Sequence, residues 1–159
     1  MSSPLIQHIT DASFEADVLG SAGFLAEASG TNTVTATTPV VGVGAIAINV
    51  SGTVAQVGSA ADVESLVSGD ITTAGNIAVS ATGTNTATSD TLLVTVGLVA
   101  GGIGNVTSQI AGAVKASTSG DFTKSNANST TANVTAVGTN TATATSPAIS
   151  IGFIEVGVA

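Results

Sequence analysis

Few side chains in this sequence could carry out a reaction. His8 is the single histidine, and a catalytic triad or a histidine-based metal site would need partners that the chain does not show. Asp62 and Glu64 lie two positions apart in SAADVESLVSG, and a carboxylate pair can serve general acid–base catalysis. Their small and polar neighbours instead predict a solvated loop or a helical turn. His8 is expected on the surface or in a terminal cap.

Other acidic side chains follow turn sequences. Asp70 and Asp121 come after Ser-Gly, and Asp90 comes after Ser, where an Asp side chain bonds local backbone groups. They lack the dense spacing of oxygen ligands in a calcium loop. Gly97–Gly104 is an apolar run without the lysine or the helix of a phosphate site. The sequence therefore predicts a protein that is not an enzyme, with no catalytic residue, no metal site and no cofactor.

The composition restricts the core and the partners. Of 159 residues 43% are hydrophobic, yet four are Phe and none is Trp, Tyr or Cys, so a core of Ala and Val must be thin. Ten acidic residues outweigh two basic ones, which argues against nucleic acid and anionic membranes as partners. The apolar runs Pro39–Val50 and Leu92–Ile103 are too short to span a bilayer, and no membrane insertion is expected. An export signal is expected outside this chain.

A repeat organises the sequence. The string GTNT occurs at Gly30–Thr33, Gly83–Thr86 and Gly138–Thr141, with spacings of 53 and 55 residues. Each copy continues as a Thr-rich alternating run, a short break and an apolar alternating run. Self-similarity at a fixed period is typical of stacked repeats. Residues 23–159 are therefore predicted to hold about two and a half repeats of about 54 residues.

Alternation along each Thr-rich run separates the two faces of a strand. We expect the face with small residues to point inward and the Thr face to point outward. The outward residues are Thr31, Thr33, Thr35, Thr84, Thr86, Thr88, Thr139, Thr141 and Thr143.

Large residues follow the break and take over one face of the strand. We interpret them as a second wall with a thicker core behind it. They are Leu92, Val94, Val96 and Leu98 in the second copy, and Ile149, Ile151 and Phe153 in the third.

One asparagine recurs at the same position of each repeat, as Asn32, Asn85 and Asn140. These residues lie on the predicted inner face, where an amide is costly unless it is hydrogen-bonded. Stacks of amides between coils provide such bonds. We expect a structural ladder that sets the register rather than a binding site.

The predicted fold is all-β: a right-handed parallel β-solenoid, or β-helix, with a short capping helix at its N-terminus. A repeat of about 54 residues is expected to form two to three coils, so that other strands separate the Thr rows. The cap is expected within residues 1–22, as a helix in Asp11–Leu19. Phe14 and Val18 are four positions apart there and would share a helix face.

The repeats resemble those of giant bacterial exoproteins of the leukotoxin and filamentous-haemagglutinin types. The resemblance rests on the GTNTATA-type strand, the apolar VxVG run after it and the preceding SGDITTAGNIAVSAT, and it covers about residues 23–159. It implies a β-helical stalk, secretion, display on the cell surface and adhesion. It supplies no catalytic residues.

The segment Leu5–Leu19, LIQHITDASFEADVL, resembles the opening strand and first helix of bacterial thioredoxins. The CxxC motif of that family is missing because the chain has no cysteine. No redox function follows from this resemblance.

Together these features predict a structural or adhesive segment of a secreted or surface-displayed bacterial exoprotein, whose receptor the sequence does not name. Two alternatives stay open. Rows of outward Thr are the kind of surface that ice-binding proteins use, although Thr also suits any exposed strand. The low charge and high β-propensity of Ile149–Ala159 predict self-association through the C-terminal coil, as dimers or as a filament.

Overall fold

The computed structural model describes residues 4–7, 9–21, 23–73, 75–124 and 131–158. Every regular element in these ranges is a β-strand. Within them, no helix is long and apolar enough to cross a membrane.

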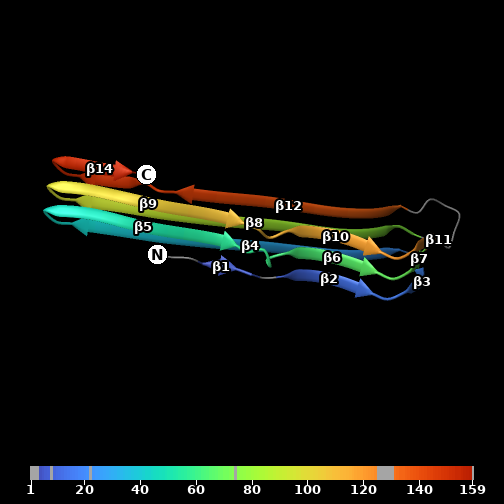
Figure 1. Ribbon diagram of the computed structural model, residues 1–159. Coiled ribbons are helices and arrows are strands. Elements are labelled where there is room, and N and C mark those ends of the chain that lie inside the picture. Colours follow the sequence, from blue (N-terminus) through green and yellow to red (C-terminus); the bar gives the residue numbers. More distant parts are fainter. Residues whose placement is uncertain (1–3, 8, 22, 74, 125–130, 159) are drawn as a thin grey trace.

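The chain passes repeatedly through the same series of strands (Figure 1). Each pass has a long strand, a return strand and two short strands. The first complete pass is β4 (Phe24–Val43), β5 (Ile46–Val57), β6 (Val63–Ser68) and β7 (Ile71–Thr73), and the second is β8 (Ile77–Val96), β9 (Val99–Ile110), β10 (Val114–Ser119) and β11 (Phe122–Lys124). They are preceded by β1 (Leu5–Ile6), β2 (Thr10–Glu15) and β3 (Val18–Ser21), and followed by β12 (Ala132–Thr145), β13 (Ala148–Ile151) and β14 (Ile154–Val158).

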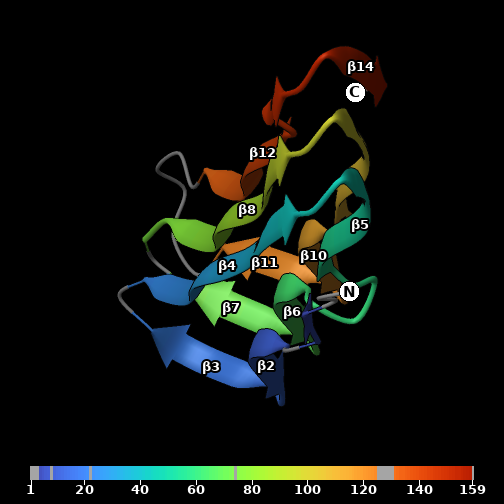
Figure 2. The same ribbon diagram turned by 90° about the vertical axis from the view of Figure 1, so that its left-hand side faces the viewer.

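Every strand pair is parallel, and each pair joins equivalent parts of successive passes. The longest ladder joins β4 to β8 without a shift, from Phe24 opposite Ile77 to Val43 opposite Val96. On its other edge β8 pairs with β12 and β13. Figure 2 shows the passes stacked from the N-terminal to the C-terminal side.

Each pass is long and flat. A strand of 20 residues such as β8 extends about 66 Å at about 3.3 Å per residue. The turns from β4 to β5, from β8 to β9 and from β13 to β14 lie at one end of the molecule (Figure 1). Gly44, Gly97 and Gly152 begin these turns. We call this end the tip. The short strands β3, β7 and β11 lie at the opposite end.

The core lies between the long strands and the strands that return beneath them. Inward side chains are mostly small, including Ala36 and Ala87 opposite Ala55 and Val57. Hydroxyl groups also bridge the two layers: the Oγ1 atoms of Thr53 and Thr91 are 2.5 Å apart. Because the side chains are short, the layers lie close together, as the composition predicts.

The predicted N-terminal helix is wrong. Residues 10–15 and 18–21 form β2 and β3, which pair in parallel with β6 and β7. Phe14 and Val18 pack against the buried cluster around Ile71, and the Phe14 ring contacts Phe24 with ring centroids 5.0 Å apart. Pairing to existing strands satisfies the backbone along its length, and this outweighs the weak helical pattern of so short a segment.

The expected two to three coils per repeat are also wrong. Equivalent strands 53 or 55 residues apart are direct neighbours, so one repeat makes one pass. The expectation assumed short strands. The strands of 20 and 12 residues are long enough that one long strand, one return strand and two short strands account for a whole repeat. The Thr rows are therefore adjacent, with no strand between them.

The second wall is a third correction. Leu92, Leu98, Ile149 and Ile151 are exposed, and Phe153 is 94% exposed. Val94 and Val96 are half-buried. The reason is that β8 continues through the sequence break as one strand, so Thr88 and Leu92 stay on the same side. Leu93, which is 1% exposed, is the residue that fills the core there.

The glycine of GTNT allows this close packing, which gives a test. A Cβ on Gly83 would lie 2.5 Å from Val114 Cγ2 and 3.2 Å from Val63 Cγ2, whereas one on Gly138 would meet only Val114, at 3.2 Å. We expect Gly83→Ala to destabilise the fold by about 1–3 kcal/mol through overpacking. Gly138→Ala, the matched control, should change the free energy of unfolding much less in urea titrations. Equal effects would contradict the proposed close approach.

Candidate functional site

Nine threonines form a regular array on the outer face of β4, β8 and β12. The register places Thr31, Thr84 and Thr139 side by side, and the two following rows repeat this arrangement. We call these nine residues, Thr31, Thr33, Thr35, Thr84, Thr86, Thr88, Thr139, Thr141 and Thr143, the threonine array. Neighbours are about 4.8 Å apart between strands and about 6.6 Å apart along a strand.

The threonine array is exposed on β4 and β12, and half-exposed at Thr86 and Thr88. Its side chains present one hydroxyl and one methyl each, and they are stiff at χ1 because they are β-branched. No charged residue occurs in the array itself. The array is therefore a neutral lattice of hydroxyl and methyl groups with fixed spacing.

The asparagines form a ladder behind this surface. Asn32 Nδ2 donates to Asn85 Oδ1 at 2.9 Å, and Asn85 Nδ2 donates to Asn140 Oδ1 at 3.0 Å. Asn32 and Asn85 are 5% and 0% exposed, whereas Asn140 is exposed. All the amides point the same way, so the ladder has a direction. It can fix the register, because a shift of one residue would break each bond.

Large apolar side chains surround the tip on both outer faces. Those of the first pass are Val41, Val43, Ile46, Ile48 and Val50, and those of the later passes are Leu92, Leu98, Ile103, Ile149, Ile151, Phe153 and Ile154. We call these twelve residues the apolar tip. All are between 40% and 94% exposed. Residues 28–61, 91–114 and 125–154 contain no charged residue. The twelve residues of the apolar tip are therefore uncharged as well as exposed, and Glu155, which follows Ile154 in β14, is an acidic residue beside them.

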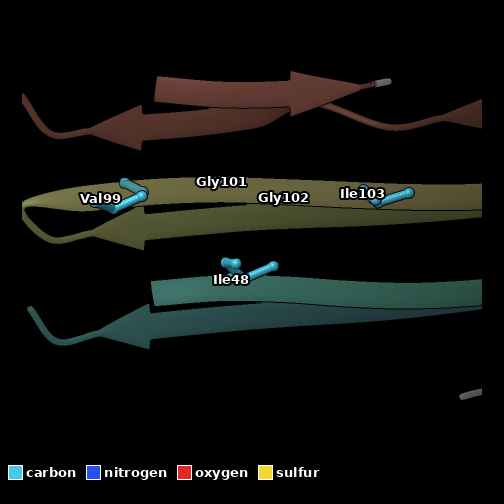
Figure 3. A pocket seen from close by; sticks show the side chains of 6 residues that line it. Ile48, Val99, Gly101, Gly102 and Ile103 are labelled. Carbon is cyan, nitrogen blue, oxygen red and sulfur yellow. The ribbon is translucent and has the colours of Figure 1, made fainter. Parts of the chain in front are cut away.

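A shallow hollow lies on the return face of the tip (Figure 3). It has a volume of about 130 Å³ and is lined by Ile48, Val99, Ile103 and the backbone around Gly101 and Gly102. The hollow exists because Gly101 has no side chain where its register partner Ile48 has a large one. Its lining is apolar and could receive a small aliphatic group.

Acidic residues gather at the opposite end from the tip. Asp17 Oδ1 accepts a hydrogen bond from the Asp70 amide, and Asp70 Oδ1 accepts one from the Asp121 amide, both at 2.9 Å. The preceding Gly69 and Gly120 have φ angles of 111° and 124°, which favour glycine. The sequence predicts that the Asp70 side chain bonds backbone groups of its own turn. It instead bonds the backbone of the equivalent turn in the next pass, because equivalent turns stack directly on one another.

The predicted loop is confirmed for Asp62, which lies in the connection between β5 and β6, and is wrong for Glu64. Glu64 lies in β6, and Asp62 directly precedes that strand. The Asp62 carboxylate accepts hydrogen bonds from Lys115 Nζ at 2.5 Å and from the Ala113 amide at 2.8 Å. These bonds lower the pKa of Asp62 and raise that of Lys115. The carboxylate thus links two passes.

Other candidates stay apart. The predicted turn at Asp90 is wrong, because Asp90 lies within β8, opposite Thr37 and Thr145. His8 lies outside the described residues. Among the residues that the structure describes, no group of three His, Cys, Asp or Glu side chains could hold a metal ion. Sequence reasoning missed the apolar tip, although the unbroken odd–even alternation through each break is a signal that could have located it.

The buried middle of the ladder can be tested. Asn85→Ala should lower the free energy of unfolding by roughly 1–3 kcal/mol, because the donor of Asn32 and the acceptor of Asn140 lose their partner. Asn140→Ala is the matched control, since its side chain is exposed and its loss should cost less. The measurement is chemical denaturation of both variants. A neutral Asn85→Ala would refute the structural ladder.

No family model, no curated protein and no solved structure matches this chain. The likeness of its repeats to giant exoproteins therefore rests on the sequence motifs alone. The same holds for the thioredoxin-like segment Leu5–Leu19, which here contributes strands.

Proposed function

We propose that this chain is a structural and adhesive segment of a secreted or surface-displayed bacterial exoprotein, without catalytic activity. The observation that carries the proposal is the unbroken register of β4 on β8 over 20 residues. A protein that repeats one strand series in register builds length and regular outer surfaces. The resemblance of its repeats to adhesin stalks agrees with this role and is the reason for proposing an extracellular location.

The stacked passes support a parallel β-solenoid. Each pass contacts the preceding and following passes through parallel ladders in all four sheets. Stability then comes from interactions between neighbouring repeats, as in other repeat proteins. A right-handed winding is the default for parallel connections in one sheet, and we adopt it here.

The apolar tip supplies the contact surface of this proposal. Exposed apolar clusters of this kind mark sites where proteins meet partners or surfaces. Val43 is 78% exposed and Ile46 is 72% exposed, and they flank the same reversal of the chain at Gly44. Because each pass adds its own tip, the contact surface is repeated along one margin of the molecule and would bind through several weak contacts at once.

This contact surface can be tested with beads coated with the chain and presented to cultured epithelial cells. The double variant Val43→Asp with Ile48→Asp should reduce bead adhesion by at least about tenfold, because each apolar side chain contributes about 1.5–3 kcal/mol when buried. The control, Thr33→Asp with Gln109→Asp, adds the same charge on exposed positions away from the tip. Circular dichroism should show intact strands in both. Equal adhesion of the two variants would overturn the adhesive role of the tip.

Ice binding is the second candidate function, and the adjacency of the Thr rows favours it. The register brings the nine residues of the threonine array onto one continuous face. Stiff, uncharged side chains at fixed spacing can hold water molecules in an ordered layer. The alternative, that Thr only makes the strand soluble, does not require three rows in register.

An ice assay separates these explanations. If the threonine array binds ice, the protein should show thermal hysteresis and shape growing ice crystals. Thr86→Lys should remove both effects, because Thr86 is at the centre of the array and a long cationic side chain prevents close approach. Gln109→Lys, which adds the same charge at an exposed position of β9, should leave them unchanged. An inactive wild-type protein would eliminate this function.

A further inference from the structure

We propose that copies of this chain stack head to tail, with the β12 edge of one copy beside the β4 edge of the next. This inference rests on the proposed stacked-coil architecture and names its partner, a second copy of the chain. Three independent features of the two edges support one simple translation between copies.

The asparagine ladder supplies the first feature. Its direction leaves Asn140 Nδ2 as a donor at the β12 edge and Asn32 Oδ1 as an acceptor at the β4 edge, neither bonded within the described residues. A second copy placed by the same translation would bring its Asn32 to Asn140 of the first. A tail-to-tail dimer would instead face Asn140 with Asn140, donor against donor. The ladder therefore favours stacking over a closed dimer.

The aspartate bonds supply the second feature, in the same direction. Asp70 and Asp121 donate their amides to the carboxylate of the preceding pass. Within the described part of the chain, this leaves the Asp121 carboxylate without such a donor and the Asp17 amide without such an acceptor. The translation that joins the asparagines would also bring Asp17 of the second copy to Asp121 of the first.

The strands β14 and β1 supply the third feature. In a stack, β14 of one copy and β1 of the next would lie in the same pass without overlapping. In this copy β14 pairs with Val99–Ile103 of β9. β1 pairs with Gln56 and Val57, whose own register partners in β9 are Gln109 and Ile110. The β1 strand of a second copy would therefore lie beside Gln109 and Ile110 of the first, in line with β14. One copy would supply β12 to β14 of the shared pass and the other β1 to β3.

Burial also distinguishes the β12 edge. Val134 on β12 is 45% exposed, whereas its register partner Val79 on β8 is 0% exposed. Val79 packs in the cluster that includes Phe14 and Phe122. A stacked copy would bring its own β2 and β3, with Phe14, over Val134. The contact would thus bury the inner face of β12 as well as pair its backbone.

Sedimentation of the 159-residue chain over a concentration series tests the proposal. We expect the mass to grow without a fixed limit, since a head-to-tail contact does not close. Asn140→Asp should weaken association by about tenfold or more, because it replaces the ladder donor with a buried acceptor charge. Thr82→Asp, the control with the same charge change at an exposed position of the middle strand β8, should associate as the wild type does.

A strict monomer, a mass that stops at two copies, or an Asn140→Asp variant that associates normally would overturn head-to-tail stacking.

A tandem variant tests the proposed stacked-coil architecture separately from association. It repeats residues 24–76 once within the chain and so adds one pass. A cooperative, strand-rich variant that melts no lower than the parent supports stacked coils even if copies do not associate. An unfolded tandem variant would overturn both proposals.

Discussion

The constraint on which this structure depends is register. Asn85 is fully buried, and its amide is satisfied only when Asn32 and Asn140 lie directly on either side of it. A slip of one residue would also send the threonines into the core and the alanines into water. Parallel strands of similar residues can pair in several registers. Here the one asparagine that each pass contributes to the ladder selects a single register. The glycine two positions earlier lets the facing layer approach closely, since a Cβ on Gly83 would collide with Val114 and crowd Val63.

The same register determines which surfaces are possible. Because every pass repeats the one before it, a residue type on the outer face becomes a row across the sheet. Threonine rows and apolar rows therefore lie on one face, in different parts of the same long strands. The acidic turns are stacked in the same manner, and the carboxylate of each pass binds the backbone amide of the next. The surface chemistry of this protein is thus arranged in lines perpendicular to its strands.

Local patterns predicted much of this arrangement. Alternation identified strands and located Asn85 and the threonines on opposite faces, and the spacing of GTNT predicted the period. Local patterns could not predict strand length, which depends on where the facing layer ends, so they predict several coils where the structure has one pass. They also favoured a helix around Phe14, because its pairing with β6 involves residues some 53 positions away. The outward position of Leu92 follows from continuity of β8, which a sequence break conceals.

The polarity of the pass along its length has a further consequence. One margin of the molecule carries the apolar tip, and the other carries the carboxylates of Asp17, Asp70 and Asp121. Adding passes lengthens both margins equally and leaves this asymmetry unchanged. The result is an amphiphilic ribbon, with an oily border and an ionic border separated by roughly the length of a 20-residue strand. Such a ribbon would collect at interfaces between water and a less polar phase. The threonine array would then lie between the two borders.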